Sequence, residues 1–154
     1  MKRLVSMAMV PLLFVVTQLP AQGRQETSMR NRFVGAWRLV ALEEQGPDGK
    51  PHRCDCTGMF VFTQDGHASV QVLTRNRQAA AAGSSNYSEG GYEASFGSYV
   101  VDEGAHTFTF HVEGALVRSL IGKDLPRKYE FSANQLVVRP TSPDEHWRVT
   151  WERY

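Results

Sequence analysis

The stretch "TFTFHVEGAL", residues 107–116, alternates apolar and polar side chains as a β-strand does. Its apolar positions share one face of the strand: Phe108, Phe110 and Val112. Its polar positions share the other face: Thr107, Thr109, His111 and Glu113. The pattern predicts a strand with one face in a hydrophobic core, and it leaves two possibilities for the polar face. His111 and Glu113 are either solvated outside a sheet or directed into a pocket.

Other alternating segments occur from residue 34 to the C-terminus, and turn signals separate them at the spacing typical of all-β sandwiches and barrels. The clearest turn is Asp65-Gly66, a dipeptide that favours a tight hairpin. The expected strands are residues 34–45, 58–63, 67–73, 92–101, 107–116, 127–132, 135–140 and 146–154. Closure hides the edges of antiparallel strands, so we predict an all-β fold, an eight-stranded antiparallel up-and-down β-barrel. A two-sheet sandwich is the alternative.

The first 23 residues have the three-part layout of a secretory signal peptide. Basic residues precede an apolar run over residues 4–19, and small residues at 21–23 offer a cleavage site. A retained membrane anchor is the alternative, but Pro11 interrupts the apolar run, which falls short of the roughly 20 residues needed to span a bilayer. We therefore expect export, to a periplasm or to the medium, without a stable membrane anchor.

The rest of the chain suits one compact domain, the barrel over residues 33–154, preceded by an N-terminal extension over 24–32. The stretch "RQETSMRNRF", which ends at Phe33, is expected to form a short helical turn or coil that plugs one end of the barrel. The whole chain has 17 Lys and Arg, 16 Asp and Glu, and a formal net charge of +1. These charges are interspersed, so they give no electrostatic footprint for nucleic acid or an anionic membrane.

Two cysteines, Cys54 and Cys56, lie close to His52 in "HRCDCTG". In an oxidising compartment they could close a small disulfide, and otherwise they form a surface pair of thiols without a role. Two thiols and one imidazole are too few ligands for a closed metal site without distant help. We expect neither a metal nor another cofactor.

The segment "FVGAWRLVALE", residues 33–43, opens with a Gly-x-Trp motif formed by Gly35 and Trp37. Five further blocks follow in order: "FTQDGHASVQV" (62–72), "FGSYVVDE" (96–103), "HVEGAL" (111–116), "RKYEF" (127–131) and "WER" (151–153). Together they resemble the bacterial and fungal lipocalin-like domain family over nearly all of residues 33–153. The resemblance implies an eight-stranded barrel with a cavity open at one end, and small, largely apolar ligands. This sequence departs from the family in two places, at Phe110, where the family often has the first histidine of a pair, and in the insertion around Cys54 and Cys56.

In lipocalin-type barrels an arginine near the end of the chain stacks over the tryptophan of the first strand. Here the resemblance assigns that contact to Arg153 and Trp37, with Gly35 beside them. A guanidinium over an indole ring provides a cation–π contact, and it would close the bottom of the barrel. We expect all three residues to be structural.

Arg127 shares a strand face with Tyr129 and Phe131, which places its guanidinium on the apolar side of the sheet. A buried guanidinium must be paired or must meet an anionic or carbonyl-bearing ligand, because an isolated buried charge is very costly. Alternatively, Arg127 lies near the rim at the start of its strand and extends to water. The residues leave both possibilities open.

For His111 and Glu113, strand parity favours the outer face, whereas the family resemblance runs through them and favours a pocket. We adopt the pocket on the strength of the resemblance. The candidate polar contacts to a ligand are Gln71, Tyr99, His111, Glu113 and Arg127. The expected apolar lining is Leu39, Phe60, Phe62, Phe96, Tyr129, Phe131 and Trp147. Loops 75–91 and 114–125 are expected to flank the mouth.

The sequence thus predicts an exported protein that binds a small hydrophobic or amphipathic molecule in a barrel cavity. It contains no Gly-x-Ser-x-Gly, no glycine-rich phosphate loop and no His-Glu-x-x-His. Two alternatives remain open. One is a barrel enzyme that moves protons with His111 and Glu113, as an isomerase or cyclase would. The other is a structural or interaction module whose centre is packed shut.

Overall fold

The structure is a computed structural model, and it describes residues 28–46, 48–76 and 86–154. The predicted signal peptide, residues 1–23, and the central part of the predicted loop 75–91 lie outside the described residues. In chain order the elements are α1 (Met29–Phe33), β1 (Gly35–Gln45), β2 (Pro51–Arg53), β3 (Cys56–Phe62), β4 (His67–Thr74), β5 (Tyr92–Asp102), β6 (Thr107–Ala115), η1 (Arg118–Leu120), β7 (Asp124–Ser132), β8 (Gln135–Pro140) and β9 (Trp147–Arg153).

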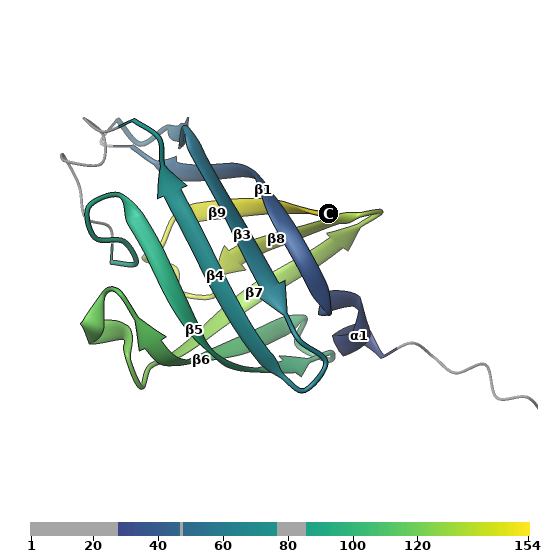
Figure 1. Cartoon of the computed structure of the whole chain (residues 1–154). Coiled ribbons are helices and arrows are strands. Elements are labelled where there is room, and N and C mark those ends of the chain that lie inside the picture. Colours follow the sequence, from purple (N-terminus) through teal and green to yellow (C-terminus); the bar gives the residue numbers. More distant parts are fainter. Residues whose placement is uncertain (1–27, 47, 77–85) are drawn as a thin grey trace, which may run out of the picture.

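From β3 onward each strand pairs antiparallel with the next, and β9 returns to pair with β1, so the sheet closes on itself (Figure 1). Trp37 lies opposite Arg153 at one end of this seam and Glu44 lies opposite Trp147 at the other. β2 and β3 follow one another along the same edge of β1, and together they act as one barrel strand. The prediction of a closed eight-stranded antiparallel barrel is confirmed, and the sandwich is excluded.

Two irregularities change which side chains point inward. In β1 the register shifts between Leu39 and Ala41, so Leu42 faces the interior further along the strand. In β6, Glu113 is an extra residue, because Val112 lies opposite Gly97 and Gly114 opposite Phe96. A Cβ on Gly97 would lie 1.9 Å from a backbone oxygen of β6, so this crossing requires glycine. Such bulges tighten the local twist and redirect side chains.

The end of the barrel next to α1 is filled with aromatic rings. Phe33, the last residue of the helix, is fully buried, and its ring centroid lies 4.9–5.3 Å from four others: Phe62, Phe108, Tyr129 and Phe131. The Trp37 Nε1 donates a hydrogen bond of 2.7 Å to the Phe33 carbonyl. The expected short helical turn before Val34 is therefore present, and its last side chain plugs the barrel.

Arg153 fixes this plug to the barrel seam. Its guanidinium carbon lies 4.3 Å from the centroid of the Trp37 ring, as the resemblance implied. It also donates hydrogen bonds of 2.7 Å to the carbonyls of Val34 and Arg32. A Cβ on Gly35, where φ is 131°, would come within 2.6 Å of that guanidinium, so the glycine makes room for the contact.

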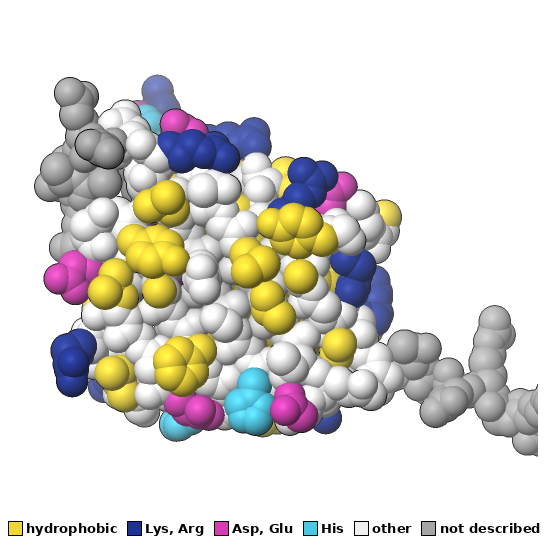
Figure 2. All heavy atoms as spheres, in the orientation of Figure 1, with side chains coloured by type: hydrophobic (Ala, Val, Ile, Leu, Met, Phe, Trp, Pro, Cys, Tyr) yellow, Lys and Arg dark blue, Asp and Glu magenta, His cyan; other side chains and the backbone are white. Residues whose placement is uncertain are grey.

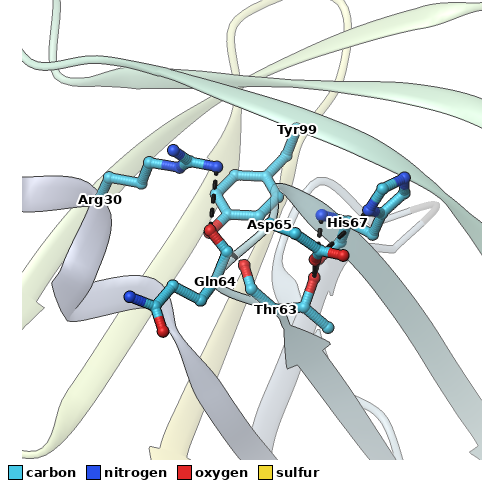
Figure 3. A network of polar contacts seen from close by, with 6 residues as sticks. All are labelled: Arg30, Thr63, Gln64, Asp65, His67 and Tyr99. Carbon is cyan, nitrogen blue, oxygen red and sulfur yellow. Dashed lines mark hydrogen bonds and ion pairs between the residues drawn. The ribbon is translucent and has the colours of Figure 1, made fainter.

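A polar network joins α1 to the hairpin between β3 and β4 at the same end (Figure 3). Arg30 donates to the Gln64 carbonyl at 3.2 Å, and its guanidinium carbon lies 5.9 Å from the centroid of the Tyr99 ring. The Tyr99 hydroxyl donates to the Thr63 carbonyl at 3.1 Å. Within the turn, Thr63 and His67 both contact the Asp65 carboxylate, and these hydrogen bonds lower the pKa of Asp65. The hairpin and the helix therefore close this end together.

Replacement of Phe33 by alanine is expected to lower the free energy of unfolding by about 3–5 kcal/mol, because it empties the centre of the aromatic cluster. The matched control is Phe96→Ala, since Phe96 is 57% exposed on the outer face, and this change should cost less than about 1 kcal/mol. Urea denaturation followed by tryptophan fluorescence measures both. Equal losses in the two variants would contradict the assignment of Phe33 as the plug.

Candidate functional site

A cavity of about 680 Å³ occupies the part of the barrel away from the Phe33 plug. Its inner wall is shared with the hydrophobic core: Phe60, Val70, Val72, Phe108, Phe110, Val138 and Trp151. The polar and charged part of the lining is Glu44, His52, Arg53, Asp55, Thr74, Asn76, Ser88, Glu93, Ser95 and Arg127. The barrel thus has one end filled with rings and one hollow end, whose lining combines core side chains with several charged groups.

Arg127 lies in the cavity wall near the start of β7 and is 8% exposed. Its guanidinium carbon lies 5.1 Å from the centroid of the Tyr87 ring and 5.0 Å from that of the Trp147 ring. Its Nη1 donates to the Pro126 carbonyl at 3.1 Å. Within residues 28–46, 48–76 and 86–154, no carboxylate forms an ion pair with it at 4.0 Å or less. Aromatic faces therefore hold the charge, but no anion neutralises it by direct contact.

Glu145 positions the two rings that flank Arg127. Its Oε2 accepts a hydrogen bond of 2.6 Å from the Tyr87 hydroxyl and one of 2.8 Å from the Trp147 Nε1. Burial alone would raise the pKa of Glu145, but these two hydrogen bonds and the charge of Arg127 outweigh it and hold that pKa below its ordinary value. Glu145 is therefore ionised at neutral pH, and it holds the rings rather than the guanidinium.

Glu93 reaches the same cavity from β5, where its backbone lies opposite Val72 of β4. Burial raises the pKa of its carboxyl to about 7; the charge of Arg127 opposes this rise and that of Glu44 adds to it. Within the described parts of the chain, its carboxyl has no hydrogen-bond or ion-pair partner. A carboxyl in this state can donate a hydrogen bond when protonated and only accept one when ionised.

The part of the sequence that forms this barrel also assigns the chain to a family. A model of the lipocalin-like domain matches residues 34–154, which is most of the chain. The chain belongs to the lipocalin-like domain family. The expected resemblance is therefore confirmed, and the hollow barrel described above is the lipocalin-like domain of this protein.

Three solved structures are similar to this lipocalin-like chain. A lipocalin-like protein from Bacteroides uniformis is 17% identical over 80% of this chain and 99% of its own, with a TM-score of 0.48. An uncharacterized protein from Bacteroides eggerthii is 15% identical over 79% and 99%, with a TM-score of 0.47. A point mutant of the fluorescent protein UnaG is 14% identical over 82% and 99%, with a TM-score of 0.42. Among curated proteins, none matches.

Of the residues expected to contact a ligand, Arg127 lines the cavity, in the interior position that strand parity gave it. His111 and Glu113 do not, and the expectation for them is corrected. Both are exposed on the outer face, where the His111 Nδ1 lies 2.7 Å from the Asp124 Oδ1. Strand parity indicated this orientation, and the family resemblance pointed the wrong way.

Four further placements differ from the expectation. Gln71 is exposed on the outer face and accepts a hydrogen bond of 3.1 Å from the Tyr92 hydroxyl. Phe96 is exposed and points outward from β5, and Figure 2 shows hydrophobic side chains on the outer face over β3, β4 and β5. Tyr99 and Tyr129 do point inward, but they pack against Phe33 in the filled end of the barrel. Neither tyrosine lines the cavity.

The expected apolar lining divides in the same way. Phe60 and Trp147 line the cavity. Phe62 and Phe131 pack against Phe33, and Leu39 belongs to the core beside them. Alternation in the sequence predicts which face of a strand is interior. It does not predict how far the aromatic filling extends along the barrel.

The two loops expected at the mouth do contribute to it through their described residues, which include Tyr87, Ser88 and Leu120. Cys54, which follows β2, forms a disulfide with Cys56, the first residue of β3, and Cys54 lines the cavity. Among the residues that the structure describes, no three His, Cys, Asp or Glu side chains converge as metal ligands would. In the same part of the chain, no helix has the length and hydrophobicity needed to cross a membrane.

Sequence reasoning missed four residues of this site. Glu93 could have been found, because it shares a strand face with Ser95 and Tyr99, which was placed inside. Glu44 could not have been found, because the bulge in β1 reverses the alternation of inward and outward side chains along the strand. Tyr87 and Glu145 lie in loops, where no periodicity assigns a direction.

The pKa of Glu93 predicts a pH-dependent stability. Because this carboxyl keeps its proton to about pH 7 in the folded protein but loses it near its ordinary pKa of 4.5 when unfolded, stability falls as the pH rises between those values. Glu93→Gln should therefore raise the free energy of unfolding at pH 8 by up to about 3 kcal/mol, and change it little at pH 4.5.

Urea denaturation of both proteins at the two pH values measures this difference. The matched control is Glu113→Gln, since Glu113 is exposed outside the barrel, and its effect should be small at both pH values. A Glu93→Gln variant that gains nothing at pH 8 would show that the carboxyl is not buried in the way described.

Proposed function

We propose that this lipocalin-like protein binds one small, largely apolar molecule inside the barrel. The observation that carries the proposal is the cavity of about 680 Å³, which lies within the range of roughly 300–1,000 Å³ common for small-molecule sites. Its inner wall consists of core side chains, so a ligand there is removed from water along much of its surface. The polar and charged groups of the lining, Arg127 and Glu93 among them, favour an amphipathic ligand over a pure hydrocarbon.

The hollow centre supports a binding protein over a packed structural module, because a packed module would extend the aromatic filling around Phe33 through the whole barrel. The proposed proton-transfer enzyme relied on His111 and Glu113 as a pair within the cavity. Both side chains are on the outer face, so the geometry gives that alternative no support.

Val149→Trp is expected to weaken binding of the neutral dye Nile red at least tenfold, because Val149 lines the cavity and an indole there would occupy ligand space. The matched control is Val100→Trp, since Val100 is 72% exposed on the outer face, and its affinity should stay within twofold of the wild type. Fluorescence titration measures the affinity, and thermal unfolding verifies that each variant folds. Equal affinities in the two variants would place the dye outside the cavity.

We also propose that the protein is exported and that residues 1–23 are removed, since they have the layout of a signal peptide. The disulfide between Cys54 and Cys56 supports an oxidising compartment. The intact mass of protein purified from its source should correspond to a chain that begins near residue 24. A full-length chain found inside the cell would contradict the proposal.

A further inference from the structure

We propose that the ligand is an amphipathic carboxylic acid, whose carboxylate pairs with the guanidinium of Arg127 while its apolar body fills the cavity. This inference rests on the proposed function, and it adds the chemical class of the ligand and the residue that selects it.

The charge of Arg127 is buried. Its side chain is 8% exposed, and within the described residues no carboxylate forms an ion pair with it. Glu145 and Glu93 interact with this charge only from a distance, so burial of the guanidinium still carries a desolvation cost, and an anion in direct contact would recover part of it. A guanidinium presents a planar fork of donors that matches a carboxylate in a bidentate pair, so a carboxylate is the group that fits it best.

The guanidinium is held in place before any ligand arrives. The Tyr87 and Trp147 rings flank it at 5.1 and 5.0 Å, and its Nη1 is bonded to the Pro126 carbonyl. Glu145 fixes both rings, with hydrogen bonds of 2.6 and 2.8 Å to the same oxygen. A preorganised donor loses little conformational entropy on binding, which favours affinity.

Glu93 lines the same cavity. An ionised Glu93 would repel a ligand carboxylate, whereas a protonated Glu93 can donate a hydrogen bond to it. The other charged and titratable groups that line the cavity are Glu44, His52, Arg53, Asp55, Tyr87 and Arg127. Of these, Arg127 favours the ionised form of Glu93 and Glu44 favours the protonated form, and burial places its pKa at about 7. The site therefore takes up a carboxylate together with a proton on Glu93.

The test compares two ligands of equal chain length, dodecanoate and dodecan-1-ol, in displacement of Nile red at pH 6. Arg127→Gln should weaken binding of dodecanoate at least tenfold and change that of dodecan-1-ol less than threefold. The matched control is Lys128→Gln, because Lys128 is the next residue of β7 and is exposed on the outer face. It should leave both affinities unchanged. Retained Nile red binding shows that each variant still has its cavity.

The pH arm tests Glu93 independently of Arg127. Between pH 6 and pH 8 the affinity of the wild type for dodecanoate should fall about tenfold, because a carboxyl with a pKa of about 7 is mostly protonated at the lower pH and mostly ionised at the higher. Glu93→Gln should remove most of this fall, and the binding of dodecan-1-ol should change little. If Arg127→Gln does not fold, Arg127→Lys replaces it, and this variant should weaken binding of dodecanoate more than that of dodecan-1-ol, because an ammonium cannot form the bidentate pair.

The inference is overturned if Arg127→Gln weakens both ligands alike or neither, or if the wild type binds Nile red in the cavity but not dodecanoate. In each of these outcomes the proposed function stands, because the dye is neutral and still reports a usable cavity. The proposed function itself fails if Val149→Trp leaves the affinity for Nile red unchanged.

Discussion

The pairing of β1 with β9 closes the barrel and positions the functional side chains at both of its ends. At one end of this seam Trp37 lies opposite Arg153, and the guanidinium that stacks on the indole also bonds the backbone leading to α1. That contact fixes the plug. At the other end Glu44 lies opposite Trp147, which puts the Trp147 ring beside Arg127 in the cavity wall. One strand pair thus positions both the filled end and the polar group of the hollow end.

The hollow end combines an apolar wall with two ionisable groups, Arg127 and Glu93, that interact electrostatically. Arg127 stays charged, and aromatic faces rather than a carboxylate surround it. Glu93 is close enough to respond to that charge, yet burial keeps its proton to about pH 7. The two groups therefore do not neutralise one another within the protein. A cavity with this arrangement is open to a partner that carries one negative charge.

The barrel could be predicted from sequence because strand alternation, hairpin turns and the Gly-x-Trp opening all agree on one architecture. Alternation also placed Arg127 inside. It failed where the period is broken, at the bulge after Leu39 that turns Glu44 inward. The resemblance misled at His111 and Glu113, where parity was right. Tyr87 and Glu145 could not be found at all, since loops carry no period and their contact spans residues far apart in the chain.

Intermolecular nuclear Overhauser effects between bound Nile red and valine methyl groups show whether a small molecule resides within the barrel. We expect contacts to Val70, Val138 and Val149, which line the cavity. Contacts confined to Val100 and its exposed neighbours on the outer face would contradict this expectation.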